Sequence, residues 1–180
     1  RGKDVRLHNI LMDNRGKNPV REINTLINSW RLLRNIQPSI VLLFTVKPVI
    51  YGAFAASILR IRSISTITGL GTAFIQGKVL RKLVSFLYRI SLTNSSCVIC
   101  QNSDDMSELR VRRIVAADKL VQVGGSGINT RKFQLVPLPI EEKFAFLFVG
   151  RLLWDKGINE YVEAARKFLV KYPNVRFQIL

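Results

Sequence analysis

Residues 39–68 read SIVLLFTVKPVIYGAFAASILRIRSISTIT, and this stretch decides the fold of the chain. The continuous apolar run at 40–44 is typical of a strand that is buried on both faces of a parallel sheet. The segment 49–60 is rich in Ala and Leu and predicts a helix, and 63–68 predicts a second strand. Strand, helix and strand in this order make the repeating unit of a parallel sheet.

Part of the same stretch has an alternative interpretation as a membrane span, because residues 39–59 carry a single charge. That charge, Lys47, is followed by Pro48 near the centre of the segment. A charge there costs roughly 3 kcal/mol on insertion scales, and proline interrupts the hydrogen bonding of a helix. We therefore favour a strand and a helix over a transmembrane segment.

The same alternation continues on both sides of this stretch. Asn18 and Pro19 predict the start of a helix that ends near residue 35, and Ser103, followed by two acids, predicts the N-cap of another. Strict alternation predicts an α/β fold with a parallel sheet covered by helices on both faces, and ligands at the carboxyl ends of its strands. The other expected elements are helices at 74–92 and 158–171 and strands at 96–101, 120–123, 144–149 and from 175 onward.

Composition divides the chain into two units. The segment 134–143 contains Pro137 and Pro139 and few residues that could form a core, so it predicts a linker. We expect one domain at 1–133 and the start of a second domain, truncated, at 144–180. Because the sequence begins at Arg1 without a methionine, we also expect it to be a fragment that lacks both ends.

The net charge of +16 points to an anionic partner: nucleic acid, a membrane surface or a phosphorylated substrate. A hydrophobic content of 48% excludes a disordered basic tail. The charge is concentrated in one region, since residues 23–103 contain nine Lys or Arg and no Asp or Glu. The first part of the chain is therefore expected to carry the anion-facing surface.

The predicted helix at 74–92 is strongly amphipathic. Such a helix can pack its apolar side on a sheet and expose its cations to solvent, or it can lie at an anionic membrane surface. Its cationic side holds Lys78, Arg81, Lys82 and Arg89, and its apolar side holds Val79, Leu80, Leu83, Val84, Phe86, Leu87 and Ile90.

The best candidate for a ligand site is the segment FLFVGRLLWDKG at 146–157. An apolar strand ends at Gly150, and Arg151 and Lys156 then precede a predicted helix. Two cations beside the N–H groups of a helix N-terminus can bind a phosphate or diphosphate, although the spacing alone also allows ordinary solvated loop residues. Glycine-rich turns at 124–127 and 69–71 are weaker candidates of the same kind.

Cysteine and histidine offer little for catalysis. Cys97 and Cys100 have C-x-x-C spacing, but positions three apart on a strand point to opposite faces. We therefore expect two buried thiols and no redox or metal site. His8 is the only histidine, which excludes histidine-based triads and histidine-rich metal sites.

Five phrases of the sequence, in this order, resemble the bacterial family 4 (group 1) glycosyltransferases, and within them the branch that acts on lipid-linked oligosaccharides. The resemblance implies the GT-B fold: a Rossmann-like acceptor-side domain, here without its first strand, and the start of a second, donor-binding Rossmann-like domain. The phrases are TVKPVIYGAFAAS (45–57), ISTITGLGTAF (64–74), CQNSDD (100–105), VGGSGINTRKF (123–133) and FLFVGRLLWDKGINEYVEAA (146–165).

The resemblance also implies roles for particular residues. Arg151 and Lys156 match the basic pair that holds the donor diphosphate, and they would stabilise the charge that grows on the leaving group. The turn Gly125, Ser126 and Gly127 matches the donor-side loop beside the interdomain cleft. Thr68, Gly69 and Gly71 would line the acceptor side, with Thr68 where many members have a histidine.

The function implied by the resemblance is retaining transfer of a hexose or N-acetylhexosamine from a nucleotide sugar to an undecaprenyl-type diphosphate-linked acceptor. It implies no metal and no cofactor, no nucleic-acid partner, and a cytoplasmic protein on the inner face of the bacterial membrane. From the cationic side of the predicted helix at 74–92 we expect contact with anionic lipid through Lys78, Arg81, Lys82 and Arg89. We expect the fragment alone to be inactive, because the family's two-glutamate donor motif would lie beyond Leu180. The alternatives are a nucleotide-sugar epimerase of the same fold, a basic nucleic-acid-binding module and a membrane-recruiting helix without catalysis.

Overall fold

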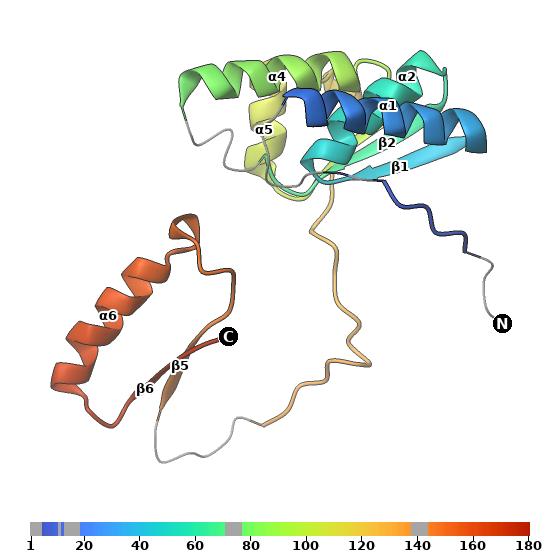
Figure 1. Ribbon diagram of the computed structural model, residues 1–180. Coiled ribbons are helices and arrows are strands. Elements are labelled where there is room, and N and C mark those ends of the chain that lie inside the picture. The colour runs from blue at the N-terminus through green and yellow to red at the C-terminus, as the bar shows by residue number, and fades with distance from the viewer. Residues whose placement is uncertain (1–4, 11, 13–18, 71–76, 138–143) are drawn as a thin grey trace. The chain divides into compact units, whose positions relative to one another are not determined.

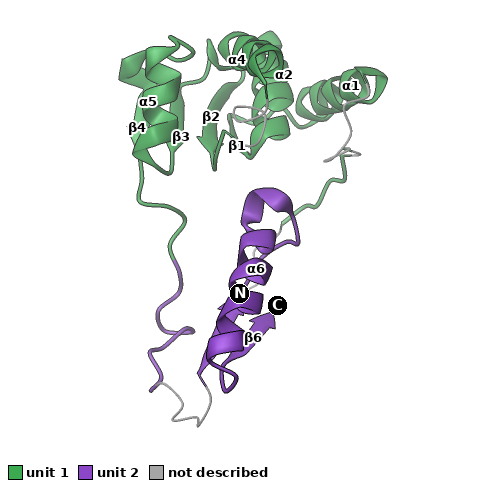
Figure 2. Cartoon of the chain, turned by 90° about the vertical axis from the view of Figure 1, so that its left-hand side faces the viewer, with its two compact units in different colours: residues 1–127 green, residues 128–180 purple. Residues whose placement is uncertain are grey.

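The computed structural model describes residues 5–10, 12, 19–70, 77–137 and 144–180. The chain divides into two compact units, 1–127 and 128–180, which Figure 2 shows in separate colours. The expected linker at 134–143 falls within the second unit, and its part from 138 to 143 lies outside the described residues.

The first unit contains a four-stranded parallel sheet whose strands lie side by side in chain order. One row of paired residues crosses the whole sheet, from Leu43 through Ser65 and Val98 to Leu120. The strands are β1 (Ile40–Phe44), β2 (Arg62–Ile67), β3 (Cys97–Cys100) and β4 (Leu120–Gln122). The helices are α1 (Pro19–Ile36), the π-helix η1 (Pro48–Gly52), α2 (Ala53–Ile58), α4 (Lys78–Leu92), α5 (Ser103–Val111) and the short η2 (Ala117–Lys119).

The helices of the first unit cover one face of this sheet (Figure 1). Crossovers between parallel strands are right-handed, so strands added one after another in the same direction bring every connecting helix to the same face. On the opposite face Ile40, Leu42 and Phe44 are exposed, Leu42 to 59%. The sequence predicts helices on both faces; within the described residues of this unit, only one face is covered.

The core of the first unit lies between the sheet and these helices. Leu43, Ile67 and Val98 of the strands pack in one cluster with Tyr88 of α4 and Leu109 of α5, all of them buried. A second, smaller cluster joins Leu33 of α1 to Ala55 and Ala56 of α2. The small side chains of α2 allow α1 to pack directly against it, and α1 thus extends the helical layer.

The second unit contains one strand-helix-strand element. β5 (Ala145–Phe148) pairs in parallel with β6 (Arg176–Ile179), and the short η3 (Trp154–Lys156) and α6 (Ile158–Lys171) lie between them. Phe146 stacks on Phe177 with ring centroids 5.0 Å apart. The Tyr161 hydroxyl accepts a hydrogen bond from the Gln178 N–H at 3.0 Å and lies 2.9 Å from the Phe146 carbonyl oxygen. These contacts fix α6 on the two strands.

Most of the predicted elements are confirmed, and the differences have local causes. The helix predicted at 158–171 has those bounds, the apolar run at 40–44 is a strand, and the strand predicted at 96–101 is present within one residue at each end. The N-cap of α5 is Asn102 and not Ser103, because the Asn102 side chain accepts the Asp105 N–H at 2.7 Å. The predicted cap at Asn18 lies outside the described residues.

The alternative of a membrane span at 39–59 is wrong, because a strand and a separate helical segment occupy this stretch. The chain turns at Thr45, which has a φ of 69°, and η1 starts at Pro48. None of the helices within the described ranges has both the length and the apolar character needed to cross a bilayer.

Gly52 allows the close approach of the η1 and α2 segment to β1. A Cβ atom at this position would lie 2.6 Å from Cδ2 of the buried Leu43.

We predict that Gly52→Val lowers the free energy of unfolding by about 1–3 kcal/mol, the usual cost of overpacking a core. Urea denaturation measures this change. Gly124→Val is the matched control because nothing lies within 4 Å of a Cβ there; equal midpoints for the two variants would contradict the packing described.

Candidate functional site

The carboxyl ends of the strands form one edge of the first sheet, and this edge is where parallel sheets bind ligands. β2 ends at Ile67, so Thr68 and Gly69 come directly after it. Thr68 is exposed, and Gly69 has a φ of 145°, a conformation that residues with a Cβ rarely adopt. Gly71, the third expected acceptor-side residue, lies outside the described residues.

Asp105 connects this β2 loop to the start of α5. Its Oδ1 atom lies 3.4 Å from the Leu70 N–H, and its own N–H is capped by Asn102. The Asp105 carboxylate also contributes to the raised pKa of the Tyr88 hydroxyl, although burial is the larger cause. The sequence marks Asp105 only as an acid in the first turn of a helix, so its position beside the β2 loop emerges from the structure.

The glycine-rich turn after β4 lies on the same edge. Gly125 and Gly127 have φ values of 96° and 70°, so both positions need glycine. Between them, the Ser126 hydroxyl accepts a hydrogen bond from Nε2 of Gln101 at 2.9 Å. Gln101 directly follows β3, and it therefore joins the loops after β3 and β4. The sequence motif that contains Gln101 is recognisable, but its hydrogen bond to Ser126 is visible only in the structure.

At the end of β1 a partly buried ion pair extends the edge. Nζ of Lys47 lies 2.5 Å from Oε1 of Glu22 on α1. Burial, and then the nearby Glu22 carboxylate, raise the pKa of the Tyr51 hydroxyl above its ordinary value. The sequence gives Lys47 only the role of interrupting a hydrophobic segment. The structure places Lys47 near the carboxyl end of β1, where it is held by its ion pair with Glu22.

The second unit presents its cations at the start of a helix. β5 ends at Phe148, Arg151 follows in the loop, and Lys156 ends the short helix η3 that leads into α6. Gly157 adopts a left-handed conformation with a φ of 77°, and no side chain caps the N-terminus of α6. The backbone N–H groups of the first turn of α6 are therefore not bound by a capping side chain.

Arg151 and Lys156 are both exposed, and neither forms an ion pair with a residue in the described part of the chain. The backbone between them is held by hydrogen bonds from the Leu153 N–H to the Arg151 carbonyl oxygen and from the Lys156 N–H to the Leu153 carbonyl oxygen. Glu160 adds one acid to the first turn of α6. Two available cations at a helix N-terminus can bind the oxygens of a phosphate group.

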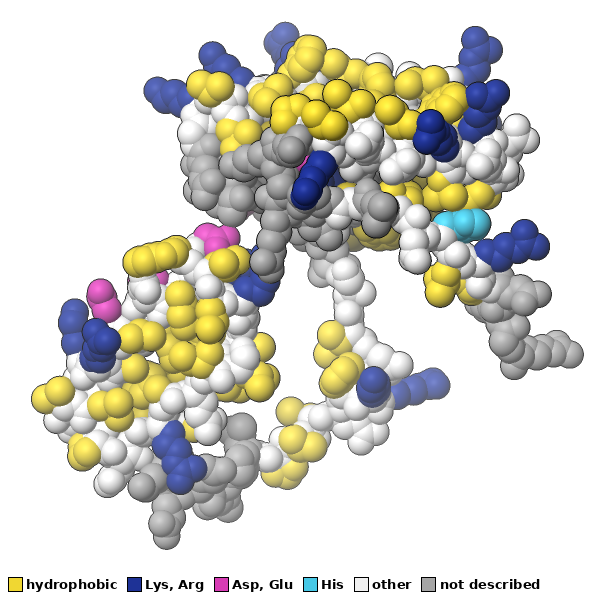
Figure 3. All heavy atoms as spheres, in the orientation of Figure 1, with side chains coloured by type: hydrophobic (Ala, Val, Ile, Leu, Met, Phe, Trp, Pro, Cys, Tyr) yellow, Lys and Arg dark blue, Asp and Glu magenta, His cyan; other side chains and the backbone are white. Residues whose placement is uncertain are grey.

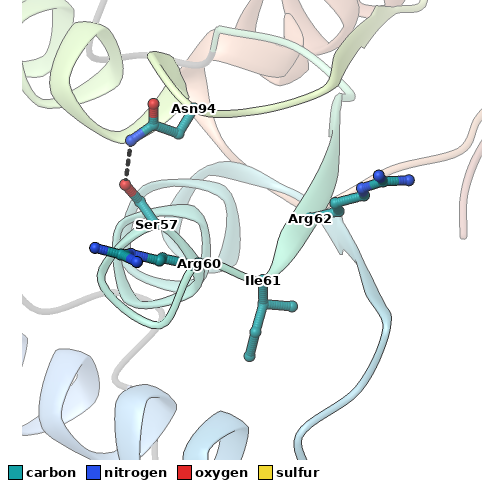
Figure 4. A pocket seen from close by; sticks show the side chains of 5 residues that line it. All are labelled: Ser57, Arg60, Ile61, Arg62 and Asn94. Atoms are coloured by element: carbon teal, nitrogen blue, oxygen red, sulfur yellow. Dashed lines mark hydrogen bonds between the residues drawn. The ribbon is translucent and has the colours of Figure 1, made fainter.

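A cavity of about 380 Å³ lies at the other edge of the first sheet, near the amino-terminal ends of β2 and β3. Its lining residues are Ser57, Arg60, Ile61, Arg62 and Asn94. Asn94 donates a hydrogen bond to Ser57 at 2.5 Å, while the two guanidinium groups point away from one another (Figure 4). Because the two arginines diverge, this cavity does not form a clamp for one anion.

The four cations assigned to the predicted helix at 74–92 differ in their surroundings. Lys78 and Lys82 on α4 are exposed, whereas Arg81 is half-buried. Nη2 of Arg89 donates a hydrogen bond to the Arg112 carbonyl oxygen at 2.7 Å, which satisfies a carbonyl at the end of α5. Lys78 and Lys82 are thus the more available pair.

The two cysteines are both free thiols. Cys100 is buried, and its burial, followed by the nearby Asp105 carboxylate, raises the pKa of its thiol to about 11. A thiol that stays protonated at neutral pH is a poor nucleophile and a poor metal ligand. The expectation of two buried thiols is thus confirmed for Cys100, whereas Cys97 is only partly buried.

A family model described as "Glycosyl transferase 4-like" matches residues 1–102, more than half of the chain. The capsular polysaccharide biosynthesis glycosyltransferase CapM of Staphylococcus aureus is 26% identical in an alignment 172 residues long, which covers 88% of this chain and 45% of that protein. The chain thus spans less than half the length of this curated relative.

Solved structures of similar architecture include a UDP-N-acetylglucosamine 2-epimerase with a TM-score of 0.57 and 16% identity, over 92% of this chain and 46% of that one. The UDP-GlcNAc 2-epimerase from Methanocaldococcus jannaschii has a TM-score of 0.54 and 18% identity, over 92% of this chain and 49% of its own. At such identities the likeness concerns the fold alone, and it confirms the expected GT-B type of α/β architecture.

The raised pKa of Cys100 predicts slow alkylation of the native chain. With a pKa of about 11, about one thiol in a thousand is ionised at pH 8, and the thiolate fraction rises about tenfold per pH unit up to the pKa. Mass spectrometry after treatment with iodoacetamide should show this pH dependence at Cys100. The same chain unfolded in urea is the control, and equal rates at pH 8 in the two states would contradict the buried position.

Proposed function

The chain belongs to the glycosyl transferase 4-like family, and on this premise we propose that it is part of a GT-B glycosyltransferase that transfers a sugar from a nucleotide sugar to a lipid-diphosphate-linked acceptor. The observation that carries the proposal is the pair of exposed cations, Arg151 and Lys156, at the uncapped N-terminus of α6. The curated relative takes part in capsular polysaccharide biosynthesis, a setting that suits a hexose or N-acetylhexosamine as the transferred group.

In this proposal Arg151 and Lys156 bind the donor diphosphate. Negative charge grows on the diphosphate as the bond between the sugar and its oxygen breaks, and fixed cations stabilise that charge more in the transition state than in the ground state. The N–H groups in the first turn of α6 add the positive end of a helix dipole. With three sources of positive potential the donor needs no divalent metal, and we expect none to take part.

We further propose that the configuration of the sugar is retained. The acceptor hydroxyl attacks on the face that the diphosphate leaves, the new glycosidic bond forms as the old bond breaks, and the hydroxyl proton passes to a leaving phosphate oxygen. This route follows the resemblance to the family and needs no nucleophilic side chain. The chain's own residues then act by binding and orienting the donor.

The acceptor is proposed to bind along the carboxyl edge of the first sheet. Thr68 and Gly69 follow β2 there, and the loop that contains them is anchored by Asp105. Thr68 offers a hydroxyl where many members of the family have a histidine, so contact with the sugar would be made by an uncharged group. Gly125, Ser126 and Gly127 would lie beside the donor.

A lipid-linked acceptor also requires that the protein reach a membrane. The stretch 23–103 has no acidic residue, and Lys78 and Lys82 are exposed on α4. We propose that these cations, with Arg81 and Arg89, face anionic lipid on the cytoplasmic side of the bacterial membrane. Cations near such a surface contribute about 1 kcal/mol each.

Binding of a nucleoside diphosphate tests the donor half of the proposal. We predict that Arg151→Gln with Lys156→Gln weakens UDP, GDP or ADP binding to the chain by about tenfold or more, since two charge-assisted contacts are lost. NMR titration measures the affinity. Arg166→Gln with Lys167→Gln is the matched control, because it removes the same charge from exposed positions farther along α6. If both double variants lost the same nucleotide affinity, the loss would come from the change in net charge, and a specific diphosphate contact of Arg151 and Lys156 would be contradicted.

In the whole protein, we predict that Arg151→Ala or Lys156→Ala lowers kcat by about a hundredfold or more, the usual cost of removing a group that stabilises transition-state charge. Transfer of radiolabelled sugar to a lipid-diphosphate acceptor measures the rate, and EDTA should leave the rate of the unsubstituted protein unchanged. Product formed without any acceptor would favour an epimerase. Unchanged donor kinetics in both variants would overturn the assignment.

A further inference from the structure

Helix α4 has a second apolar side that the core does not use. Tyr88 and Leu92 are buried against the first unit, and Leu80, Val84 and Leu87 are half-buried beside them. Four other apolar side chains of the same helix face solvent, and we call them the α4 ridge: Val79 is 82% exposed, Leu83 53%, Phe86 56% and Ile90 40%. The sequence predicts all of the apolar residues on one packed side, so the structure divides that side in two.

The ridge is continuous along the helix. Its members are separated by four, three and four residues, so each lies one turn from the next and all four lie on one line. Figure 3 shows hydrophobic side chains gathered over α4, with Lys and Arg side chains near them. Single exposed apolar residues are ordinary, but a row of four over three turns marks a surface that binds something.

The charge around the ridge identifies its partner. Lys78 and Lys82 are exposed and lie one turn apart beside the ridge, whereas α4 itself contains no Asp or Glu. The absence of acids extends from residue 23 to residue 103 of the sequence. The exposed apolar row and the cations beside it match a partner with an apolar interior and a negatively charged surface. A bilayer that contains anionic lipids has both properties.

We propose that α4 is an interfacial helix whose ridge inserts into the boundary between head groups and acyl chains of an anionic bilayer. Lys78 and Lys82 then lie at the level of the lipid phosphates, while Tyr88 and Leu92 remain in the protein core. This inference rests on the membrane contact in the proposed function and deepens it, because it assigns the contact to apolar insertion and not to charge alone.

Vesicle flotation of the 180-residue chain tests the insertion. We expect binding to vesicles of phosphatidylglycerol and phosphatidylethanolamine, and a loss of about tenfold or more with Leu83→Gln and Phe86→Gln, since both side chains lose their apolar burial. Val111→Gln with Val170→Gln is the matched control: it removes two exposed apolar helix residues, 78% and 87% exposed, outside the ridge. The control should bind like the unsubstituted chain.

Salt separates insertion from attraction by charge. Lys78→Glu with Lys82→Glu should weaken binding at low ionic strength, and this effect should shrink in 0.5 M NaCl, where the screening length falls to about 4 Å. The effect of Leu83→Gln and Phe86→Gln should persist in the same salt. If the bound fraction of every variant depends on salt alone, the contact is electrostatic and the ridge does not insert.

Depth is measured by a tryptophan placed on the ridge. In Phe86→Trp, brominated lipids should quench the added fluorescence, whereas Val111→Trp should show no added quenching. No binding of the unsubstituted chain, no quenching at position 86, or self-association that is abolished by the ridge variants would each overturn the proposal. The sugar-transfer proposal would survive all three results, because it depends on Arg151 and Lys156 and is measured by donor binding and turnover.

Discussion

The hydrogen-bonded pairing of four parallel strands in chain order is the constraint on which the rest of the first unit depends. Because each strand adds to the same side of the sheet, right-handed crossovers carry every connecting helix to one face. The same order aligns all four carboxyl ends on one edge, where Lys47, Thr68, Gln101 and Ser126 follow their strands. The helical layer, the ligand edge and the bare face are therefore consequences of one pairing pattern.

In the proposed function the positive charge of the chain serves two physically different purposes. At Arg151 and Lys156 it is focused by a helix N-terminus, which suits a compact diphosphate with several oxygens. On α4 the cations flank an apolar row, which suits an extended surface with charge on the outside and hydrocarbon beneath. Composition alone does not distinguish these uses, because both contribute equally to a net charge of +16.

Periodicity predicts the elements well and their environments less well. The helix at 158–171 and the strand at 40–44 are recognisable because apolar spacing differs between helices and strands, but only one face of that strand is covered. The cap at Asn102 is missed because Asn, Ser and Asp are all good caps, and only the backbone decides which side chain reaches the free N–H. Asp105 and Gln101 are missed as parts of the ligand edge because their partners, Leu70 and Ser126, are far away in sequence.

The sequence by itself determined the alternation of strands and helices, the family and the basic loop at 151–156, because each depends on the spacing of apolar residues or on a short sequence motif. The tertiary structure alone decided which apolar side chains are covered. Leu83 and Val84 are neighbours of similar polarity, yet Leu83 faces solvent and Val84 packs against the core. Burial depends on what lies across from a residue, and strands and helices distant in the chain supply that surface.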